Sequence, residues 1–249
     1  LNGGKPVIEN HGDDGGLRDP FLFRKSDASF VMLATDLCIV RRNNNWKDAI
    51  ENGSRNILIW DSEDLVHWKN KRALEMPIPD ATCAWAPEVI ADQNVALVIW
   101  SAKRPGIPFK VYGTYTRDFE HFDSPSVFCE DEMDVIDTTV VPCGDGFLRF
   151  TKREKSGRIL MEKASSLRGP WEEVESEFLR ELRNVEGPIC YSLDDGRTVL
   201  LLDGYGMNPP AYRAFLSEDP ASGVFRSADA LFHSSIRLKH GSVLRISEP

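Results

Sequence analysis

Short apolar runs alternate with polar turns along almost the whole chain. In four places, two such runs flank a turn rich in Gly, Asp, Asn or Ser, which is the pattern of a β-hairpin. The predicted hairpins cover residues 21–33, 89–100, 140–150 and 189–202. Only the short stretch 46–51 has apolar spacing that would suit a helix. The pattern therefore predicts an almost entirely β fold.

A strand, a turn and an aromatic residue also recur together along the chain. The copies cover residues 57–68, 111–122, 159–171 and, more weakly, 213–225. Each copy ends in Trp or Phe, and successive ends lie about 50 residues apart. A period of this length is typical of one four-stranded blade of a β-propeller.

A second set of landmarks shares this period, and most of them place a carboxylate or a histidine beside Pro or Gly. We call them stations: Arg18-Asp19-Pro20, Ala86-Pro87-Glu88, Ile136-Asp137-Thr138, Glu186-Gly187-Pro188 and His240-Gly241-Ser242. Five stations predict a five-bladed β-propeller formed as a single domain by residues 1–249. The innermost strand of each blade lines the central channel, so we expect the acids of the first four stations to face one polar funnel.

The fifth blade is expected to be incomplete in this chain. Only residues 242–246 follow the last station as a candidate strand, and residues 5–8 can add one more. Such a blade would leave an exposed strand edge, which natural sheets avoid. We therefore expect the missing strands to lie ahead of Leu1.

Composition excludes some classes of protein. The net charge of −9 argues against nucleic acid as a partner, because no basic patch is available to neutralise phosphates. No apolar run approaches 18 residues, so no membrane span is expected. The five cysteines are odd in number and contain no C-x-x-C pair, so we expect mostly buried thiols rather than a zinc site or a disulfide framework.

Converging carboxylates suit one kind of chemistry in particular. Hydrolysis of a glycoside by water requires one carboxylate as a base and one protonated carboxylic acid that releases the leaving group. Burial and like-charge neighbours can hold these two states at one pH. The stations supply enough acids for both roles, with a third carboxylate to tune the acid.

In this order and spacing, the stations resemble glycoside hydrolase family 43, whose members are inverting five-bladed propellers. The resemblance implies that Asp19 of the R-D-P segment is the general base and Glu186 of E-G-P is the general acid. It implies that Asp137 of the I-D segment modulates the pKa of the acid and orients the substrate. It also covers the W-A-P-E segment ending at Glu88 and the H-G-S segment at His240.

Each site residue also has a plainer interpretation. An Asp before Pro commonly begins a turn, and Asp134 competes with Asp137 for the third station. Glu88 is expected either to bind a sugar hydroxyl or to act as a structural partner, and the structural role is favoured. Trp85 suits stacking on a sugar or packing in the core. The resemblance implies that His240 lies near a central calcium or ordered water, or that it orients a carboxylate, and His240 is also a candidate substrate-binding residue.

The first interval between stations is longer than the others because of an insertion at residues 41–46. Trp46 lies in this insertion and outside the repeat. We expect the insertion to form a rim loop that shapes the pocket.

The sequence therefore predicts an inverting, exo-acting glycosidase for oligosaccharides or polysaccharides. The resemblance favours α-L-arabinofuranosides, with β-D-xylosides and β-D-galactofuranosides as alternatives. No cofactor or catalytic metal is expected, a structural calcium is left open, and the oligomeric state is not predicted. A secreted or periplasmic location is expected, with a cytoplasmic one left open.

Two rival functions remain open. A retaining, fructosidase-like propeller shares the R-D-P segment, but it uses E-C at the acid and an N-D-P-N-type nucleophile segment that this sequence lacks. A carboxylate separation of about 5 Å would favour that enzyme, against roughly 6.5 to 9.5 Å for inversion. The other rival is a non-catalytic carbohydrate-binding propeller.

Overall fold

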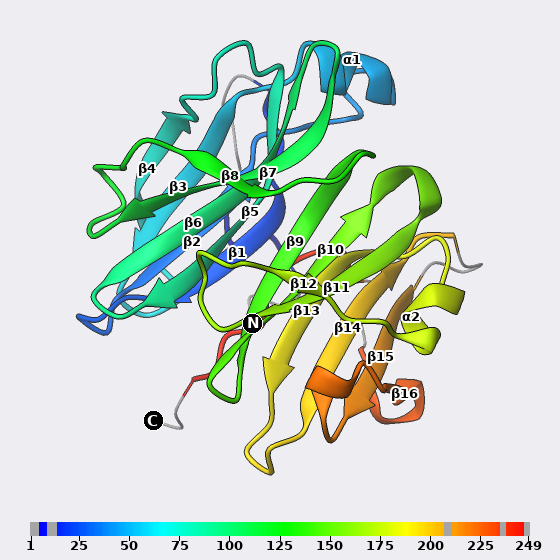
Figure 1. The fold of residues 1–249 in the computed structure, drawn as a ribbon. Coiled ribbons are helices and arrows are strands. Elements are labelled where there is room, and N and C mark those ends of the chain that lie inside the picture. Colours follow the sequence, from blue (N-terminus) through cyan, green and yellow to red (C-terminus); the bar gives the residue numbers. More distant parts are fainter. Residues whose placement is uncertain (1–4, 9–13, 207–210, 235–237, 247–249) are drawn as a thin grey trace.

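The computed structural model describes residues 5–8, 14–206, 211–234 and 238–246. Within these ranges the chain forms four sheets of four antiparallel strands, taken in order along the sequence. Two sheets (β1–β8) lie on one side of the molecule and two (β9–β16) on the other (Figure 1). The predicted all-β propeller is therefore confirmed, with four complete blades in the described part of the chain.

Each sheet runs from its first strand to its fourth without a crossover. The first sheet contains β1 (Arg18–Arg24), β2 (Phe30–Thr35), β3 (Asn56–Ser62) and β4 (Trp68–Glu75). The second contains β5 (Cys83–Asp92), β6 (Val95–Arg104), β7 (Ile107–Thr116) and β8 (Ser126–Cys129). The third contains β9 (Val135–Cys143), β10 (Gly146–Arg153), β11 (Arg158–Ala164) and β12 (Glu172–Glu173). The fourth contains β13 (Glu186–Ser192), β14 (Thr198–Gly204), β15 (Ala211–Ser217) and β16 (Arg226–Ser227).

Two short helices interrupt the strands in the described ranges. The helix α1 (Trp46–Glu51) forms where the sequence predicts it, and the Asn45 side chain caps it by accepting from the Asp48 N–H. The helix α2 (Glu177–Glu181) was not predicted, and Ser176 caps it through the Leu179 N–H. Neither is long and apolar enough to span a bilayer. Three 3₁₀ turns complete the set: η2 (Glu154–Ser156), η3 (Pro220–Ser222) and η4 (Asp229–Leu231).

The core lies between neighbouring sheets, so the middle strands are apolar on both faces. All seven residues of β14 are buried, and successive side chains point to opposite faces. Leu200 and Leu202 pack with Phe150 of the third sheet, whereas Leu201 joins the cluster on the outer face of the fourth. This double burial explains why the predicted strands read as short continuous apolar runs.

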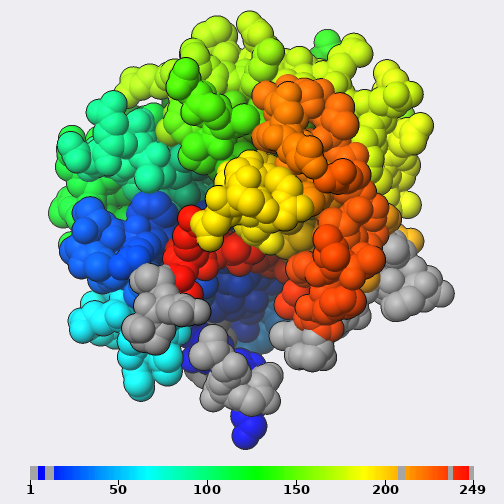
Figure 2. All heavy atoms as spheres, turned by 90° about the horizontal axis from the view of Figure 1, so that it is seen from below, coloured from blue at the N-terminus to red at the C-terminus, as the bar shows by residue number. Residues whose placement is uncertain are grey.

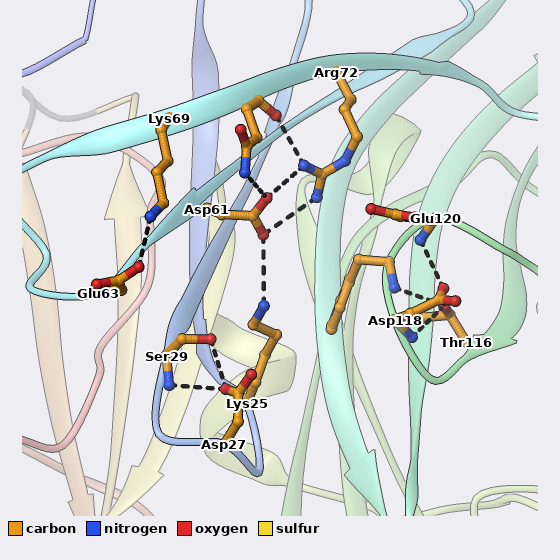
Figure 3. A network of polar contacts seen from close by, with 12 residues as sticks. Lys25, Asp27, Ser29, Asp61, Glu63, Lys69, Arg72, Thr116, Asp118 and Glu120 are labelled. Carbon is orange, nitrogen blue, oxygen red and sulfur yellow. Dashed lines mark hydrogen bonds and ion pairs between the residues drawn. The ribbon is translucent and has the colours of Figure 1, made fainter.

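The turn that follows the third strand is the same in the first two sheets. After β7, Thr116 Oγ1 accepts from the N–H groups of Asp118 and Phe119, and Asp118 Oδ1 accepts from the N–H of Glu120 (Figure 3). Asp118 Oδ1 also accepts from the His121 N–H. After β3, Ser62 and Asp64 make the corresponding bonds. The structure thus accounts for the strand-turn-aromatic repeat in the sequence, because this turn leads into the aromatic residue.

A partly buried group of charges near the turn after β3 links β3 and β4 to the residue that follows β1. Asp61 of β3 accepts from Arg72 of β4 at 2.5 Å, and Lys25, which follows β1, lies 3.6 Å away (Figure 3).

The two predicted strands of the fifth blade do not form in the described residues. Residues 5–8 and 238–246 have no strand pairing, so this part of the prediction is wrong. The C-terminal segment 238–246 instead lies between the first and fourth sheets, where it fills part of a hollow (Figure 2). It is held there by side chains: Ser242 Oγ accepts from the Leu22 N–H at 2.9 Å, and Lys239 Nζ lies 2.7 Å from Asp203 Oδ2.

All five cysteines are unpaired. Cys83 and Cys129 are buried, and burial raises the pKa of the Cys83 thiol to about 12 and that of Cys129 to about 11. The other three are partly buried, so the expectation of mostly buried thiols holds fully for only two. Raised pKa values make the two buried thiols unreactive at neutral pH.

Candidate active site

The first strand of each sheet bends at its station. The pairing with the second strand is interrupted between Arg18 and Phe21, between Trp85 and Glu88, and between Glu186 and Ile189. In the third sheet the interruption falls at Asp137, because Ile136 and Thr138 pair with consecutive residues of the second strand. One residue in each bend has positive φ: Asp19 (49°), Ala86 (48°), Asp137 (50°) and Gly187 (53°).

These four positive-φ residues are the structurally equivalent positions of the propeller. Asp19 and Asp137 therefore occupy the same place in their blades. Glu186 precedes the equivalent residue by one position, and Glu88 follows it by two. Equal spacing in the sequence does not give the four acids equal positions in space.

The residue before each bend lines one cavity of about 530 Å³, and so do the carboxylates of the first, third and fourth stations. Charged and aromatic side chains make up most of the lining, which includes Arg18, Asp19, Trp46, Trp85, Ile136, Asp137, Lys152, Glu154, Glu186, Asp203, Tyr205, Lys239 and His240. The structure thus brings together five of the six residues that the sequence singled out.

Asp19 is held by two neighbours. Its Oδ2 accepts from Thr35 Oγ1 at 2.9 Å, and its Oδ1 lies 3.5 Å from His240 Nδ1. Thr35 Oγ1 in turn accepts from the Ala86 N–H at 2.8 Å, so the second sheet fixes the hydroxyl that orients Asp19. The Asp19 side chain is 16% exposed, which leaves it accessible to a water molecule in the cavity.

Asp137 is the most deeply buried of the three predicted catalytic acids. Its N–H donates to Ser101 Oγ at 3.2 Å, and its Oδ2 accepts from the Gly187 N–H at 3.2 Å. Burial raises the pKa of Asp137 to about 6, although the charges of His240 and Lys152 act in the opposite direction. Asp134 lies outside the cavity lining, where it pairs with Lys103.

Glu186 directly precedes Gly187, whose N–H donates to Asp137, and its side chain is partly exposed to the cavity. Its Oε2 accepts from Lys152 Nζ at 2.8 Å, and the side chain is 26% exposed. Gly187 beside it allows a close approach, because a Cβ at this position would lie 2.7 Å from the His240 ring. Both its positive φ and this contact explain why glycine stands there.

Glu88 does not reach the cavity lining. It is 4% exposed, and burial raises its pKa well above the usual range. Its position two residues beyond the bend points it into the interior near Thr139. The expectation that Glu88 faces the funnel is therefore wrong, and the structural role that the sequence favoured fits its placement.

Aromatic side chains form one wall of the cavity. Trp85 packs against Phe109 with ring centroids 5.3 Å apart and meets Trp46 edge-on at 6.3 Å. Trp46 is 47% exposed, and the Arg18 guanidinium lies 5.1 Å from its ring centroid. The insertion therefore contributes to the pocket, as predicted for a rim loop.

Several cavity residues were not singled out from the sequence. Three of them, Lys152, Asp203 and Tyr205, lie on or just beyond second strands, whereas the first four stations lie on first strands. Lys152 and Asp203 are recognised from the strand pairing. In each sheet, the residue before the bend pairs with one residue of the second strand, and these partners are Thr35, Ser101, Lys152 and Asp203.

We call these four residues the bridging positions. The first three contact the following station, and Asp203 contacts the residue just before the fifth station. Thr35 bonds the Ala86 N–H, Ser101 bonds the Asp137 N–H, Lys152 bonds Glu186, and Asp203 bonds Lys239. In the described part of the chain, no group of three or more His, Cys, Asp or Glu residues is arranged to hold a metal ion.

A β-propeller whose cavity gathers three carboxylates beside aromatic rings has the architecture of an enzyme that cleaves glycosidic bonds. Comparison supports this class, since residues 1–249 match a family related to glycoside hydrolase family 43 and described as "Probable glycosyl hydrolase domain". The chain belongs to this family, and its fold is that of the family-43 propellers.

A curated relative and several solved structures resemble the chain. An α-L-arabinofuranosidase of Bifidobacterium longum is 28% identical over 87% of this chain, which spans about 24% of that relative's length. An arabinanase from Bacillus subtilis has a TM-score of 0.60 at 14% identity, covering 86% of this chain and 75% of its own. An exo-β-1,3-galactanase from Phanerochaete chrysosporium has a TM-score of 0.64 at 13% identity, covering 90% and 53%. At these identities the structures support the fold alone.

Proposed function

We propose that the protein is an inverting, exo-acting glycosidase that releases α-L-arabinofuranosyl units from oligosaccharides or polysaccharides. The observation that carries the proposal is the meeting of Asp19, Asp137 and Glu186 in one cavity beside Trp85. The substrate class is supported by the name of the Bifidobacterium longum relative. β-D-Xylosides and β-D-galactofuranosides are the alternative substrates.

Asp19 is the proposed general base. Thr35 and His240 hold its carboxylate, so one oxygen can accept a proton from a water molecule in the cavity. The water oxygen attacks the anomeric carbon on the face opposite the leaving group. This attack gives a product of inverted configuration.

Glu186 is the proposed general acid. It gives its proton to the glycosidic oxygen as the bond to the anomeric carbon breaks, and the electron pair of that bond goes to the oxygen. Asp137 lies behind it and accepts from the Gly187 N–H, which fixes the backbone beside the acid. These proton transfers require no cofactor or metal, and a structural calcium would take no part in them.

Two variants test these roles. We expect Asp19→Asn to lower kcat/KM by about 10²- to 10⁴-fold on every substrate, because it removes the group that activates water. Glu186→Gln should cause a loss of this size on methyl glycosides, whose leaving group needs the proton, and a smaller loss on nitrophenyl glycosides. The assays use nitrophenyl α-L-arabinofuranoside, β-D-xyloside and β-D-galactofuranoside, each beside its methyl glycoside. Glu63→Gln, which alters a surface pair with Lys69, serves as the matched control and should keep wild-type rates.

The stereochemistry of the first product separates inversion from retention. Proton NMR during hydrolysis should show the inverted anomer before mutarotation, and a retained anomer would favour the fructosidase-like mechanism. Sugar binding without turnover of any of the three substrates by the wild-type protein would favour a carbohydrate-binding propeller.

A further inference from the structure

Lys152 differs in kind from the residues at the earlier bridging positions. Thr35 and Ser101 present hydroxyls to backbone N–H groups of the next station. Lys152 occupies the corresponding position of the third sheet, paired with Ile136, but it bonds a side chain. Its partner is Glu186, the proposed general acid, at 2.8 Å.

The Lys152 ammonium is almost completely enclosed and carries a full charge. Its side chain is 3% exposed, and its Nζ lies 2.5 Å from Glu154 and 5.0 Å from the centroid of the Tyr205 ring. Burial alone would lower the pKa of Lys152, but the carboxylates of Asp137, Glu186 and Glu154 outweigh burial and raise it. A buried charge of this kind is costly unless it is paired, so its place beside the acid calls for a reason.

We propose that Lys152 is a positioning residue for the general acid, which it holds by one oxygen and stabilises once the acid has given up its proton. This inference rests on the proposed function. The ammonium donates to Oε2 of Glu186, which leaves Oε1 for the leaving group. When the Glu186 proton moves to the glycosidic oxygen, the carboxylate that forms already faces a fixed cation.

The proton balance of this step is simple. Glu186 loses one proton, the leaving oxygen gains it, and Lys152 stays protonated throughout. The cation therefore matters most in a transition state in which the Glu186 proton is largely transferred. The extent of proton transfer in the transition state depends on the leaving group. A nitrophenolate departs with little protonation, whereas an alkoxide must be protonated as it departs.

This dependence separates a catalytic contribution from a purely structural one. A lysine that only stabilises the fold would affect all substrates equally. A lysine that supports the acid would matter more for an alkyl glycoside than for a nitrophenyl glycoside of the same sugar. Both substrates place the same sugar against the same wall of the cavity.

The experiment compares Lys152→Met with the wild type on methyl and 4-nitrophenyl α-L-arabinofuranoside, or on the matching pair of whichever sugar the wild type cleaves. We expect kcat/KM to fall by about 10- to 100-fold on the methyl glycoside and by less than about 3-fold on the nitrophenyl glycoside. Glu186→Gln should show the same preference more strongly. Lys110→Met, which breaks a lysine pair with Glu130 outside the cavity, is the matched control and should show no preference.

Equal losses on both substrates, with melting temperatures near that of the wild type, would overturn the inference and leave the proposed function standing. If the wild-type protein cleaves neither the methyl nor the nitrophenyl glycoside of any of the three sugars, the proposed function itself fails. If Lys152→Met does not fold, Lys152→Arg carries the test, because it keeps the charge but moves the donor. A preference of more than about 3-fold for the nitrophenyl glycoside would then support the inference, and equal losses would overturn it.

Discussion

At the scale of single residues, burial of Asp137 in the cavity makes the free energy of unfolding depend on pH. Asp137 is the acid whose pKa is raised to about 6 by burial, and it lies against the Gly187 N–H in the interior. A carboxylate whose pKa is raised on folding stabilises the folded state while it is protonated. This stabilisation is fully present at pH values below the ordinary pKa of 3.8. That contribution is lost as the pH rises through about 6.

Asp137→Asn should therefore stabilise the protein at pH 7 by about 1–3 kcal/mol, because the neutral amide avoids burial of a charge. Its oxygen can still accept from the Gly187 N–H. Thermal melting at pH 7 should show the gain, which should vanish near pH 4. Asp118→Asn is the matched control with the opposite sign, since N–H donors of His121 and Glu120 lower the pKa of Asp118. A destabilised Asp137→Asn at pH 7 would contradict this account.

The sequence predicted Asp19, Asp137 and Glu186 as cavity residues, but it could not place Glu88. Equal spacing locates a station to within a few residues, whereas the bend at each station shifts side chains by one or two positions. A shift of one residue along a strand turns a side chain to the other face. Lys152 was missed because it belongs to no motif and is recognised only through its strand pairing.

At the scale of elements, one arginine holds the rim insertion in place. Arg42 donates from Nη2 to Asp14 at 2.7 Å and to the Asn52 carbonyl at 3.0 Å, and from Nη1 to Asp48 at 2.6 Å. These bonds join the segment before β1 to both ends of α1, the helix that begins with Trp46. The position of the exposed Trp46 ring therefore depends on Arg42.

Arg42→Met should loosen this wall of the pocket without touching the carboxylates. We expect a loss of about 1 kcal/mol in substrate binding, which is about a 5-fold rise in KM, with kcat within about 2-fold of the wild type. Steady-state kinetics on the best nitrophenyl glycoside measure both. Arg226→Met, which removes an exposed pair with Glu218, should change neither constant. A lower kcat at unchanged KM would argue against a role of the insertion in binding.

The sequence predicted α1 to its observed bounds but gave no sign of α2. The five residues of α2 are too few to show a 3.6-residue period. Its Ser176 cap is a local signal, but a serine before a glutamate is common in loops as well. Short helices in a turn-rich chain are therefore recognised mainly from the structure.

At the scale of the whole molecule, the C-terminal segment joins the first sheet to the fourth. Lys239 pairs with Asp203, whose side chain is 3% exposed, and Ser242 bonds Leu22 of β1. Residues Lys239 and His240 of this segment line the cavity. The segment thus couples the arrangement of the sheets to the site.

Lys239→Met should leave Asp203 as a buried carboxylate without its cation. We expect a loss of about 1–3 kcal/mol in the free energy of unfolding, measured in urea, because the Lys239 end of the pair is half exposed. The double variant Asp203→Asn with Lys239→Met should recover part of this loss. Equal stability of wild type and Lys239→Met would show that the pair does not hold the segment.

The repeat in the sequence was enough to predict the blades, because each blade forms its own hairpins from one stretch of chain. It failed for residues 5–8 and 242–246, where apolar residues suggested strands. A strand requires a partner for its backbone groups, and in the described structure Ser242 meets β1 through its side chain. Pairing between distant segments cannot be deduced from local pattern.

The bends at the stations also explain which acid stands where. Gly, Asn and Asp adopt a φ near 50° most readily, and only Asp among these offers a carboxylate, although Ala86 shows that the bend also admits another residue. Asp19 and Asp137 therefore place a carboxylate at the bend at a lower backbone cost than a glutamate would. Glu186 precedes the bend and has no positive φ, so the chain can use the longer side chain there. The choice between aspartate and glutamate in this cavity thus follows from the backbone on which each acid stands.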